Sequence, residues 1–202
     1  MKWPPDRRPL EGSIVRLEPI EAEHRDDLRA ASREAETWTW LGRDVPESDE
    51  AFSRWFEARL QASRAAEEWC FITRSVATGR VIGSSSYLHI RTEHDGLEIG
   101  WTWLHPSAWR TGANLDAKLL MLTDAFDELG CMRVEFKTDA RNERSRAALE
   151  ALPATYEGIF RQHMLTPGVG RRNSAYYSIV DSEWPRVRAN LERRLAREPA
   201  HA

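Results

Sequence analysis

The chain has 202 residues, 41% of them hydrophobic and 30% charged, and its 29 basic and 32 acidic residues give a net charge of −3. This composition is typical of a soluble globular protein and argues against bulk binding to nucleic acid, while no apolar run is long enough to span a membrane. The start of the chain lacks the apolar segment of a signal peptide, so we expect a cytoplasmic protein with neither membrane nor nucleic-acid partners.

The first half of the chain predicts strands and helices in succession. Residues 1–12, rich in proline and arginine, are expected to form an irregular lead-in, and residues 13–202 a single domain. Alternation of apolar and polar residues indicates the strands, and apolar residues on one face indicate the helices. In chain order we expect a strand at 13–18, helices at 21–33 and about 48–64, and antiparallel strands at 69–76, 81–90 and 97–104.

The second half continues the pattern. We expect a helix at about 113–129, a strand at 131–139, a helix at 143–152, strands at 155–165 and 175–180, and a last helix at about 182–197. Because a helix joins strand 97–104 to strand 131–139, these two are candidates for a parallel pair. The order predicts an α/β fold of the α+β type, with a mixed, mostly antiparallel sheet of about seven strands, flanking helices and an extra C-terminal helix. Cys70 and Cys131 lie in apolar strand-like runs, so we expect buried thiols and no metal site.

The segment after strand 97–104 has the features of an anion site. His105-Pro106 ends the strand, since proline cannot donate to a ladder. From Ala113 the apolar residues recur at helical spacing, and between the two elements lies the short loop Trp-Arg-Thr-Gly at 109–112. A glycine-containing loop that opens a helix leaves several backbone N–H groups pointing one way, which suits a phosphate or pyrophosphate.

The stretch from Glu98 to about Val180 resembles the GNAT superfamily of acyl-CoA-dependent N-acetyltransferases, in particular the branch of the ribosomal-protein alanine N-acetyltransferases. The resemblance rests on WTWLHPSAWRTGANLDAKLLMLTDAFDELGCMRVEFKTDARNERSRAALEAL, where Trp-x-x-Gly at 109–112 and Asn-x-x-Ser at 142–145 stand at the family spacing. The C-terminal YYSIVDSEWPRVRANLERRL resembles the same branch. At the end of the loop motif, where the superfamily has glycine or alanine, this chain has Asn114. The implied GNAT fold agrees with the predicted order of elements.

The resemblance implies that acetyl-CoA is the acyl donor and lies in a V-shaped gap between strands 97–104 and 131–139. Backbone N–H groups of the loop and the first helical turn are expected to hold its pyrophosphate: Arg110, Thr111, Gly112, Ala113 and Asn114. The N–H groups near Trp101 and Trp103 are expected to polarise the thioester carbonyl, as the bulged strand of the family does. Asn142 is expected to contact the donor and to cap its helix. Ser145, one turn later, is expected to protonate the departing CoA thiolate, or else to be a plain surface serine.

Glu98 is the candidate for the base that the attacking amine requires. It is expected beside the acyl group, on the face of its strand opposite to Ile99 and Trp101. A carboxylate held among apolar side chains can take the ammonium proton, often through a water; the alternative is a carboxylate paired with a neighbouring arginine. His163 is a second candidate base, for which a partly buried structural role is the alternative.

The acceptor is expected to be a primary amine, either a small molecule or a protein N-terminus. Several aromatic side chains and one loop either wall its pocket or belong to the core: Trp38, Trp40, Trp55, Phe56, Tyr87 and the loop 167–173. The leading interpretation is acetyl transfer by direct attack without a covalent enzyme intermediate. The alternatives are another donor such as succinyl-CoA, or a non-catalytic module that binds CoA. Trp184, Val187, Leu191 and Leu195 of the last helix serve either a homodimer or packing on their own sheet.

Overall fold

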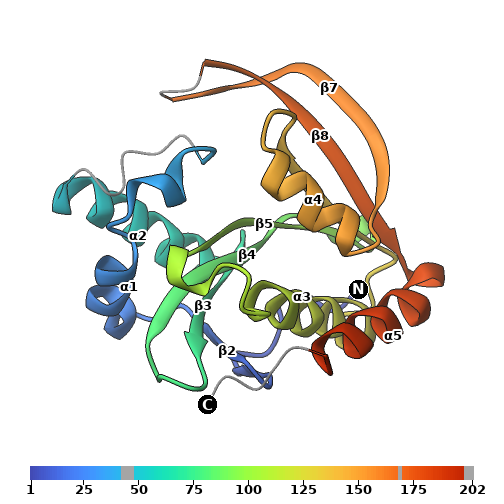
Figure 1. The fold of residues 1–202 in the computed structure, drawn as a ribbon, viewed down its shortest axis with the longest axis horizontal. Coiled ribbons are helices and arrows are strands. Elements are labelled where there is room, and N and C mark those ends of the chain that lie inside the picture. The colour runs from blue at the N-terminus through green and yellow to red at the C-terminus, as the bar shows by residue number, and fades with distance from the viewer. Residues whose placement is uncertain (42–47, 168–169, 198–202) are drawn as a thin grey trace.

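The computed structural model describes residues 1–41, 48–167 and 170–197, which form one sheet with helices on both faces (Figure 1). Within these residues the sheet has eight strands in the order β1-β2-β3-β4-β5-β6-β8-β7. All neighbours are antiparallel except β5 and β6, which are parallel. The strands are β1 (Leu10–Glu11), β2 (Val15–Pro19), β3 (Trp69–Ser75), β4 (Val81–Arg91), β5 (Gly96–Leu104), β6 (Arg133–Asp139), β7 (Thr155–Thr166) and β8 (Gly170–Val180). The predicted mixed, mostly antiparallel sheet is confirmed, with one more short strand at its edge.

The helices divide between the two faces of the sheet. They are α1 (Arg25–Ala31), α2 (Asp49–Arg64), α3 (Ala113–Thr123), α4 (Glu143–Ala151) and α5 (Trp184–Leu195). Apolar side chains of α1 and α2 form one core with the sheet, and those of α3, α4 and α5 form a larger core on the other face. In α5, Val187 and Leu191 are fully buried in that larger core, so this helix packs on its own chain. No helix among the described residues is long and apolar enough to cross a membrane.

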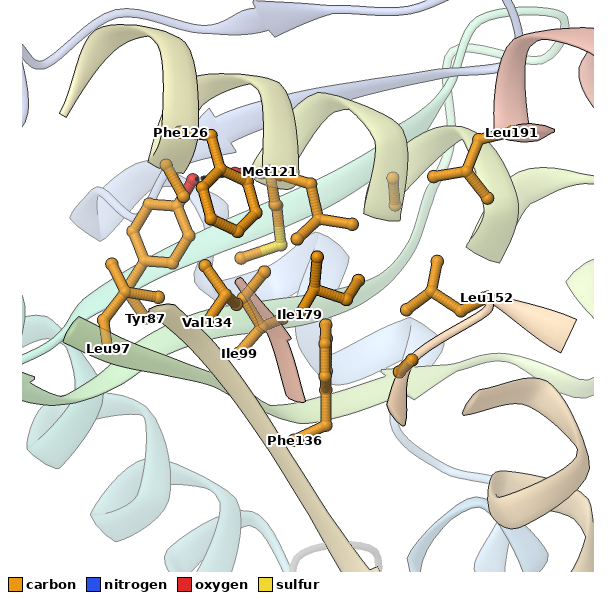
Figure 2. Packing of buried hydrophobic residues seen from close by; sticks show 14 of the residues in the cluster. Tyr87, Leu97, Ile99, Met121, Phe126, Val134, Phe136, Leu152, Ile179 and Leu191 are labelled. Atoms are coloured by element: carbon orange, nitrogen blue, oxygen red, sulfur yellow. Dashed lines mark hydrogen bonds between the residues drawn. The ribbon is translucent and has the colours of Figure 1, made fainter. Parts of the chain in front are cut away.

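The larger core lies between the α3 segment and the middle of the sheet. Figure 2 shows Met121 and Phe126 turned toward Ile99, Val134 and Ile179, which come from β5, β6 and β8. Burial of each such side chain contributes about 1.5–3 kcal/mol to folding, so this face fixes α3 firmly on the sheet. The position of α3 matters for function because its first turn follows the predicted anion loop.

Three local features differ from the sequence-based expectations. The lead-in 1–12 contains β1, which pairs with β2, and the Trp3 ring packs edge-on against Trp69 with centroids 6.2 Å apart. β8 already begins at Gly170, so part of the predicted loop 167–173 is strand, while residues 168 and 169 lie outside the described part of the chain.

The helix predicted at 113–129 is α-helical only to Thr123 and continues as a π-helical turn at Asp124–Glu128. Next to this change the Tyr87 hydroxyl donates to the Met121 carbonyl oxygen at 2.7 Å, and so offers that carbonyl a partner outside the helix. The expected burial of the two cysteines is confirmed, since Cys70 and Cys131 are buried free thiols, and burial raises the pKa of each to about 12.

Candidate functional site

The sheet is interrupted between its two parallel strands. The ladder pairs Gly96–Glu98 of β5 with Arg133–Glu135 of β6 and ends there, although β5 continues to Leu104 and β6 to Asp139. Each strand stays paired with its other neighbour, β4 or β8, along this stretch. Beyond the short ladder the two strands therefore separate, at the place where the sequence predicts the donor gap.

A β-bulge lies in β5 where the strands separate. The register between β4 and β5 shifts between Ser84 and Ser86, so Trp101 and Thr102 of β5 together stand opposite a single β4 residue. Trp101 has a φ of 49°, in the left-handed region that non-glycine residues rarely adopt. Bulges of this kind turn backbone and side chains into new directions and are frequent beside active sites.

The bulge overturns one expectation about this strand. Strict alternation places Trp101 on the face opposite to Glu98. In the structure Trp103 packs in the core under α1 and α2, with its ring centroid 5.0 Å from that of Trp38. The Arg59 guanidinium of α2 lies 5.9 Å from the Trp101 ring. Both β5 tryptophans share the face of Glu98, because the extra residue of the bulge reverses the alternation beyond it.

Glu98 is buried in an ion pair that spans the separating strands. Only 3% of the residue is exposed, and its Oε2 accepts a hydrogen bond from Lys137 Nζ of β6 at 2.9 Å. His89 Nε2 of β4 lies 3.7 Å from the same oxygen and 2.9 Å from Lys137 Nζ. The partner of the carboxylate is thus a lysine with a histidine beside it, instead of the purely apolar surroundings or the arginine that the sequence suggested.

Gly100 makes room for this carboxylate. A Cβ at position 100 would lie 2.8 Å from Glu98 Oε1 and 2.9 Å from Leu88 Cδ1, closer than real Cβ contacts come. The missing side chain therefore determines where the Glu98 carboxylate lies.

The loop before α3 has the conformation expected of an anion site. Gly112 is the N-cap residue, with a φ of 78° that glycine adopts without a steric penalty. The first helical hydrogen bond runs from Asp116 N–H to the Gly112 carbonyl at 2.9 Å, so the N–H groups of residues 113–115 precede the helical ladder. The Thr111 side chain holds the loop itself, since its hydroxyl donates to the Ala108 carbonyl at 2.7 Å.

The start of α4 faces this loop across a groove. Asn142 caps α4, its Oδ1 accepting from the Ser145 N–H at 3.1 Å, so the predicted cap is present. The groove has a volume of about 370 Å³ and is lined by Glu36, Thr39, Trp40, Trp109, Arg141, Asn142, Glu143 and Arg144. The Arg144 guanidinium lies 3.7 Å from the centre of the Trp109 ring, which joins the two motifs directly.

Two further arginines beside the start of α4 are engaged within the protein. Arg141 pairs with Asp139 at 2.8 Å, and Arg146 donates to the Tyr177 hydroxyl at 3.1 Å.

Of the aromatic residues considered for the acceptor pocket, four are core residues: Trp38, Trp55, Phe56 and Tyr87. Trp40 is half-buried and lines the groove described above.

His163 lies on β7 and makes structural contacts. Its ring nitrogens lie 3.0 Å from Ser174 Oγ and 3.3 Å from the Tyr176 hydroxyl, both on β8. Burial, together with the positive charges of Lys137 and Arg172, lowers the pKa of His163, so the ring is neutral near pH 7. These contacts fit the structural alternative for this histidine.

Sequence reasoning missed two lysines of the site, although each left a signal. Lys137 follows Glu135 by two residues, and Glu135 is in register with Glu98, so a parallel pairing puts Lys137 on the face of Glu98. Lys118 precedes Met121 by three residues on the apolar stripe of α3, where a charged residue is unexpected. It is 6% exposed, and its Nζ donates to Thr102 Oγ1 at 2.8 Å.

Comparison with known proteins accounts for this arrangement. A family model for the acetyltransferase (GNAT) domain matches residues 15–155. A solved GCN5-related N-acetyltransferase from Brucella melitensis shares 35% sequence identity over 96% of this chain and 88% of that chain, with a TM-score of 0.88. A structure from Chromobacterium violaceum assigned to the GNAT family shares 26% identity over 90% of each chain, with a TM-score of 0.80.

Structures with lower sequence identity to this chain show that they share its fold and no more. The ribosomal-protein-S5-alanine acetyltransferase from Vibrio fischeri shares 16% identity over 88% of this chain and 98% of that chain, with a TM-score of 0.73. The search of curated proteins finds no match. The match to the domain covers more than half of the chain and agrees with the bulged β5, the separating parallel strands and the anion loop. The chain therefore belongs to the GNAT acetyltransferase family.

Proposed function

We propose that this acyltransferase moves an acetyl group from acetyl-CoA to a primary amine by direct attack of the amine on the thioester. The observation that carries the proposal is the separation of β5 from β6, with the anion loop at the start of α3 and the buried Glu98 on the opposite face of the sheet. Reactants that enter from opposite faces meet in one orientation, which removes much of the entropic part of the barrier.

The donor is assigned to the side of α3 and α4. The N–H groups from Arg110 to Asn114 hold the pyrophosphate, and Gly112 lets it approach the backbone. The stacked pair of Arg144 and Trp109 lies beside this position and adds a positive charge. Asn142 and Ser145 contact the pantetheine arm. Backbone N–H groups of the bulge at 101–103 polarise the thioester carbonyl, the usual role of preorganised donors in acyl transfer.

Glu98 is assigned the removal of the ammonium proton. Lys137 and His89 hold its carboxylate in one position, which a base needs before a proton can move efficiently. The approaching ammonium offers the carboxylate a second cationic partner, and the proton moves from nitrogen to oxygen directly or through a water. The neutral amine then attacks, so no covalent enzyme intermediate is needed.

Thermal unfolding with a panel of CoA thioesters tests the donor first. A larger rise in midpoint with acetyl-CoA than with succinyl-CoA supports the proposed donor, and the reverse order supports the alternative one. Release of free thiol with a library of amines and peptide N-termini then tests turnover. Stabilisation by a CoA thioester without turnover on any amine would leave the non-catalytic module as the better description.

The acceptor is proposed to be a small amine or a protein N-terminus. The acidic Glu98 lies buried beside Lys137 on the face opposite to the donor, so an amine that arrives as an ammonium ion suits this face. Competition between peptides with free and blocked N-termini in the thiol-release assay distinguishes the two acceptor classes.

A further inference from the structure

Lys118 is a buried cation with no counter-charge. Its Nζ donates to Thr102 Oγ1 at 2.8 Å and to Ser85 Oγ at 3.3 Å, and both acceptors are neutral. Within the described part of the chain, no acid comes close enough to influence its ionisation. Asp116, the nearest acid along α3, is turned away and accepts the Ile14 N–H at 2.6 Å. A buried ammonium without a carboxylate is costly, and such groups concentrate where a ligand supplies the missing charge.

The position of Lys118 coincides with the separation of the two parallel strands. Thr102 belongs to the bulge of β5, beyond the last ladder pair at Glu98. On the other strand, Phe136 is the first residue after the ladder, and its ring centroid lies 6.0 Å from Lys118 Nζ. The Thr102 and Ser85 hydroxyls are 2.6 Å apart, so Lys118 is bonded to both strands at the bulge, to β5 through Thr102 and to β4 through Ser85.

Lys118 and Glu98 lie on opposite faces of the sheet. Lys118 comes from α3, which begins at the anion loop and covers the face proposed to receive the donor. Glu98 lies on the other face, where Lys137 and His89 surround it. An ammonium group and a carboxylate are therefore held on the two sides of the place where the thioester and the amine are proposed to meet.

We propose that Lys118 is the acid that protonates the CoA thiolate as it leaves. The inference rests on the proposed acetyl transfer. In this step the new C–N bond forms and the C–S bond breaks, its electron pair stays on sulfur, and sulfur takes a proton from Lys118 Nζ. The acceptor ammonium loses one proton to Glu98 before attack, which Glu98 passes on to solvent, and loses a second proton to solvent as the amide forms. Lys118 recovers a proton from solvent, so each turnover releases one proton in total.

The acidity of the group suits this step. Burial lowers the pKa of Lys118 to about 7. A thiol of ordinary acidity has a pKa of about 8.5, so the proton passes from nitrogen to the thiolate downhill. The cation also stabilises negative charge on sulfur before the proton moves, and that effect is strong in a buried site.

Ionisation of the bound CoA thiol tests the proposal without an acceptor. The ultraviolet absorbance of the thiolate is followed against pH in the CoA complexes of the unmodified chain and of Lys118→Met. We expect thiolate to form in the unmodified chain at a lower pH than in free CoA, because a protonated amine beside the sulfur favours the ionised thiol. Lys118→Met should remove this shift, and Lys118→Arg should retain it.

The controls separate this role from others. Lys2→Met makes the same chemical change at an exposed residue whose N–H bonds the Leu129 carbonyl, beyond the end of the α3 segment, and should leave the thiol pKa as in the unmodified chain. Lys118→Gln keeps a donor for Thr102 but has no charge, so it repeats the test if Lys118→Met does not fold. An unchanged thiol pKa in both neutral variants would overturn the proposal. A shift lost in Ser145→Ala instead would assign the proton to Ser145.

Turnover supplies a second, independent readout. With an amine accepted in the thiol-release assay, Lys118→Met should lower kcat about 100-fold, in the range of general acid catalysis, while its folded state is retained. If the unmodified chain binds no CoA compound at all, the proposed function fails, and this inference fails with it. Binding with an unshifted thiol pKa refutes the role of Lys118 alone.

Discussion

At the scale of single residues, the site depends on charges that the sheet buries on its two faces. Glu98 and Lys137 neutralise one another on one face, whereas Lys118 has only hydroxyl partners on the other. Most proteins exclude such groups from their interior, because removing a charge from water is costly. These buried charged groups lie beside the separating strands, which is why we place the reaction there.

Replacing Glu98 by glutamine tests its role as a base. Glu98→Gln keeps the shape of the side chain but cannot take the ammonium proton, so kcat should fall about 100-fold. The dissociation constant of acetyl-CoA, measured by titration calorimetry, should change little because the donor lies on the other face. Glu135→Gln is the matched control, since Glu135 is also an ion-paired carboxylate on the adjacent strand. An unchanged kcat in Glu98→Gln would remove Glu98 from the mechanism.

The buried ammonium of Lys118 predicts a particular dependence of stability on pH. Burial lowers its pKa to about 7, whereas the unfolded chain has a lysine pKa of about 10.4. Between these values the unfolded state binds the extra proton, so the free energy of unfolding rises with pH by up to about 1.4 kcal/mol per unit. Below pH 7 both states are protonated and the full cost of burial is present.

Urea unfolding of the unmodified chain and of Lys118→Met at a series of pH values measures this term. Lys118→Met should be the more stable protein at pH 7, and its advantage should shrink as the pH approaches 10. A constant difference between the two curves would contradict a depressed lysine pKa in the folded chain.

At this scale the sequence supports only part of the site. Glu98, Gly112 and Asn142 can be chosen from motif spacing, and the structure gives Gly112 and Asn142 the local conformations that this spacing requires. The Glu98–Lys137 contact could not be predicted from motif spacing, because it depends on the register of two strands far apart in the chain. The expectation that Trp101 lies on the face opposite to Glu98 was wrong for a related reason. The extra residue of the bulge moves every later side chain of the strand to the other face.

At the scale of elements, the anion loop depends on one glycine conformation. Gly112→Ala must place a Cβ at a φ of 78°, which costs roughly 1–2 kcal/mol for a non-glycine residue. The loop should therefore relax, its N–H groups should diverge, and the affinity for acetyl-CoA should fall by about tenfold or more. Calorimetric titration of the folded variant measures this loss.

Gly79→Ala is the matched control for this variant. Gly79 has a φ of 67° in the turn between β3 and β4, and a Cβ there would meet no atom within 4 Å. The control should suffer a similar loss of stability and keep the unmodified affinity. Equal affinity in both variants would show that the loop conformation does not matter for the donor.

Element boundaries followed from periodicity wherever one face is buried. The spacing in α3 and the alternation in β5 each reflect a core face, so these elements were predicted near their true positions. The bulge in β5 was implied only by the family resemblance, and the π-helical turn after α3 was not predicted. The first changes a register between strands, and the second coincides with a contact from the Tyr87 hydroxyl, so neither is encoded in the local pattern.

At the scale of the whole molecule, a continuous core holds together a sheet that its own hydrogen bonds join weakly. β1 to β5 form one antiparallel set, and β6, β8 and β7 form another. The two sets share a ladder of three residue pairs, with α3 crossing from one set to the other. The overall order of elements could be predicted because each element has its own periodicity, whereas the length of that shared ladder could not, since no local signal marks where two parallel strands separate.

Because this ladder is short, the free protein has a weakly bonded boundary between β5 and β6, called the seam below. Backbone amides of β5 and β6 beyond the ladder lack a strand partner on one side, so hydrogen exchange there should proceed through small openings well below the global unfolding free energy. Acetyl-CoA bound between the strands should slow this exchange by a factor close to 1 + [L]/Kd. In the free protein, the amides of β2 and β3 should exchange more slowly than those beyond the ladder. Equal exchange rates of all strands in the free protein would contradict a local seam. In the bound state the donor should therefore join the two halves of the sheet more tightly than the core does alone.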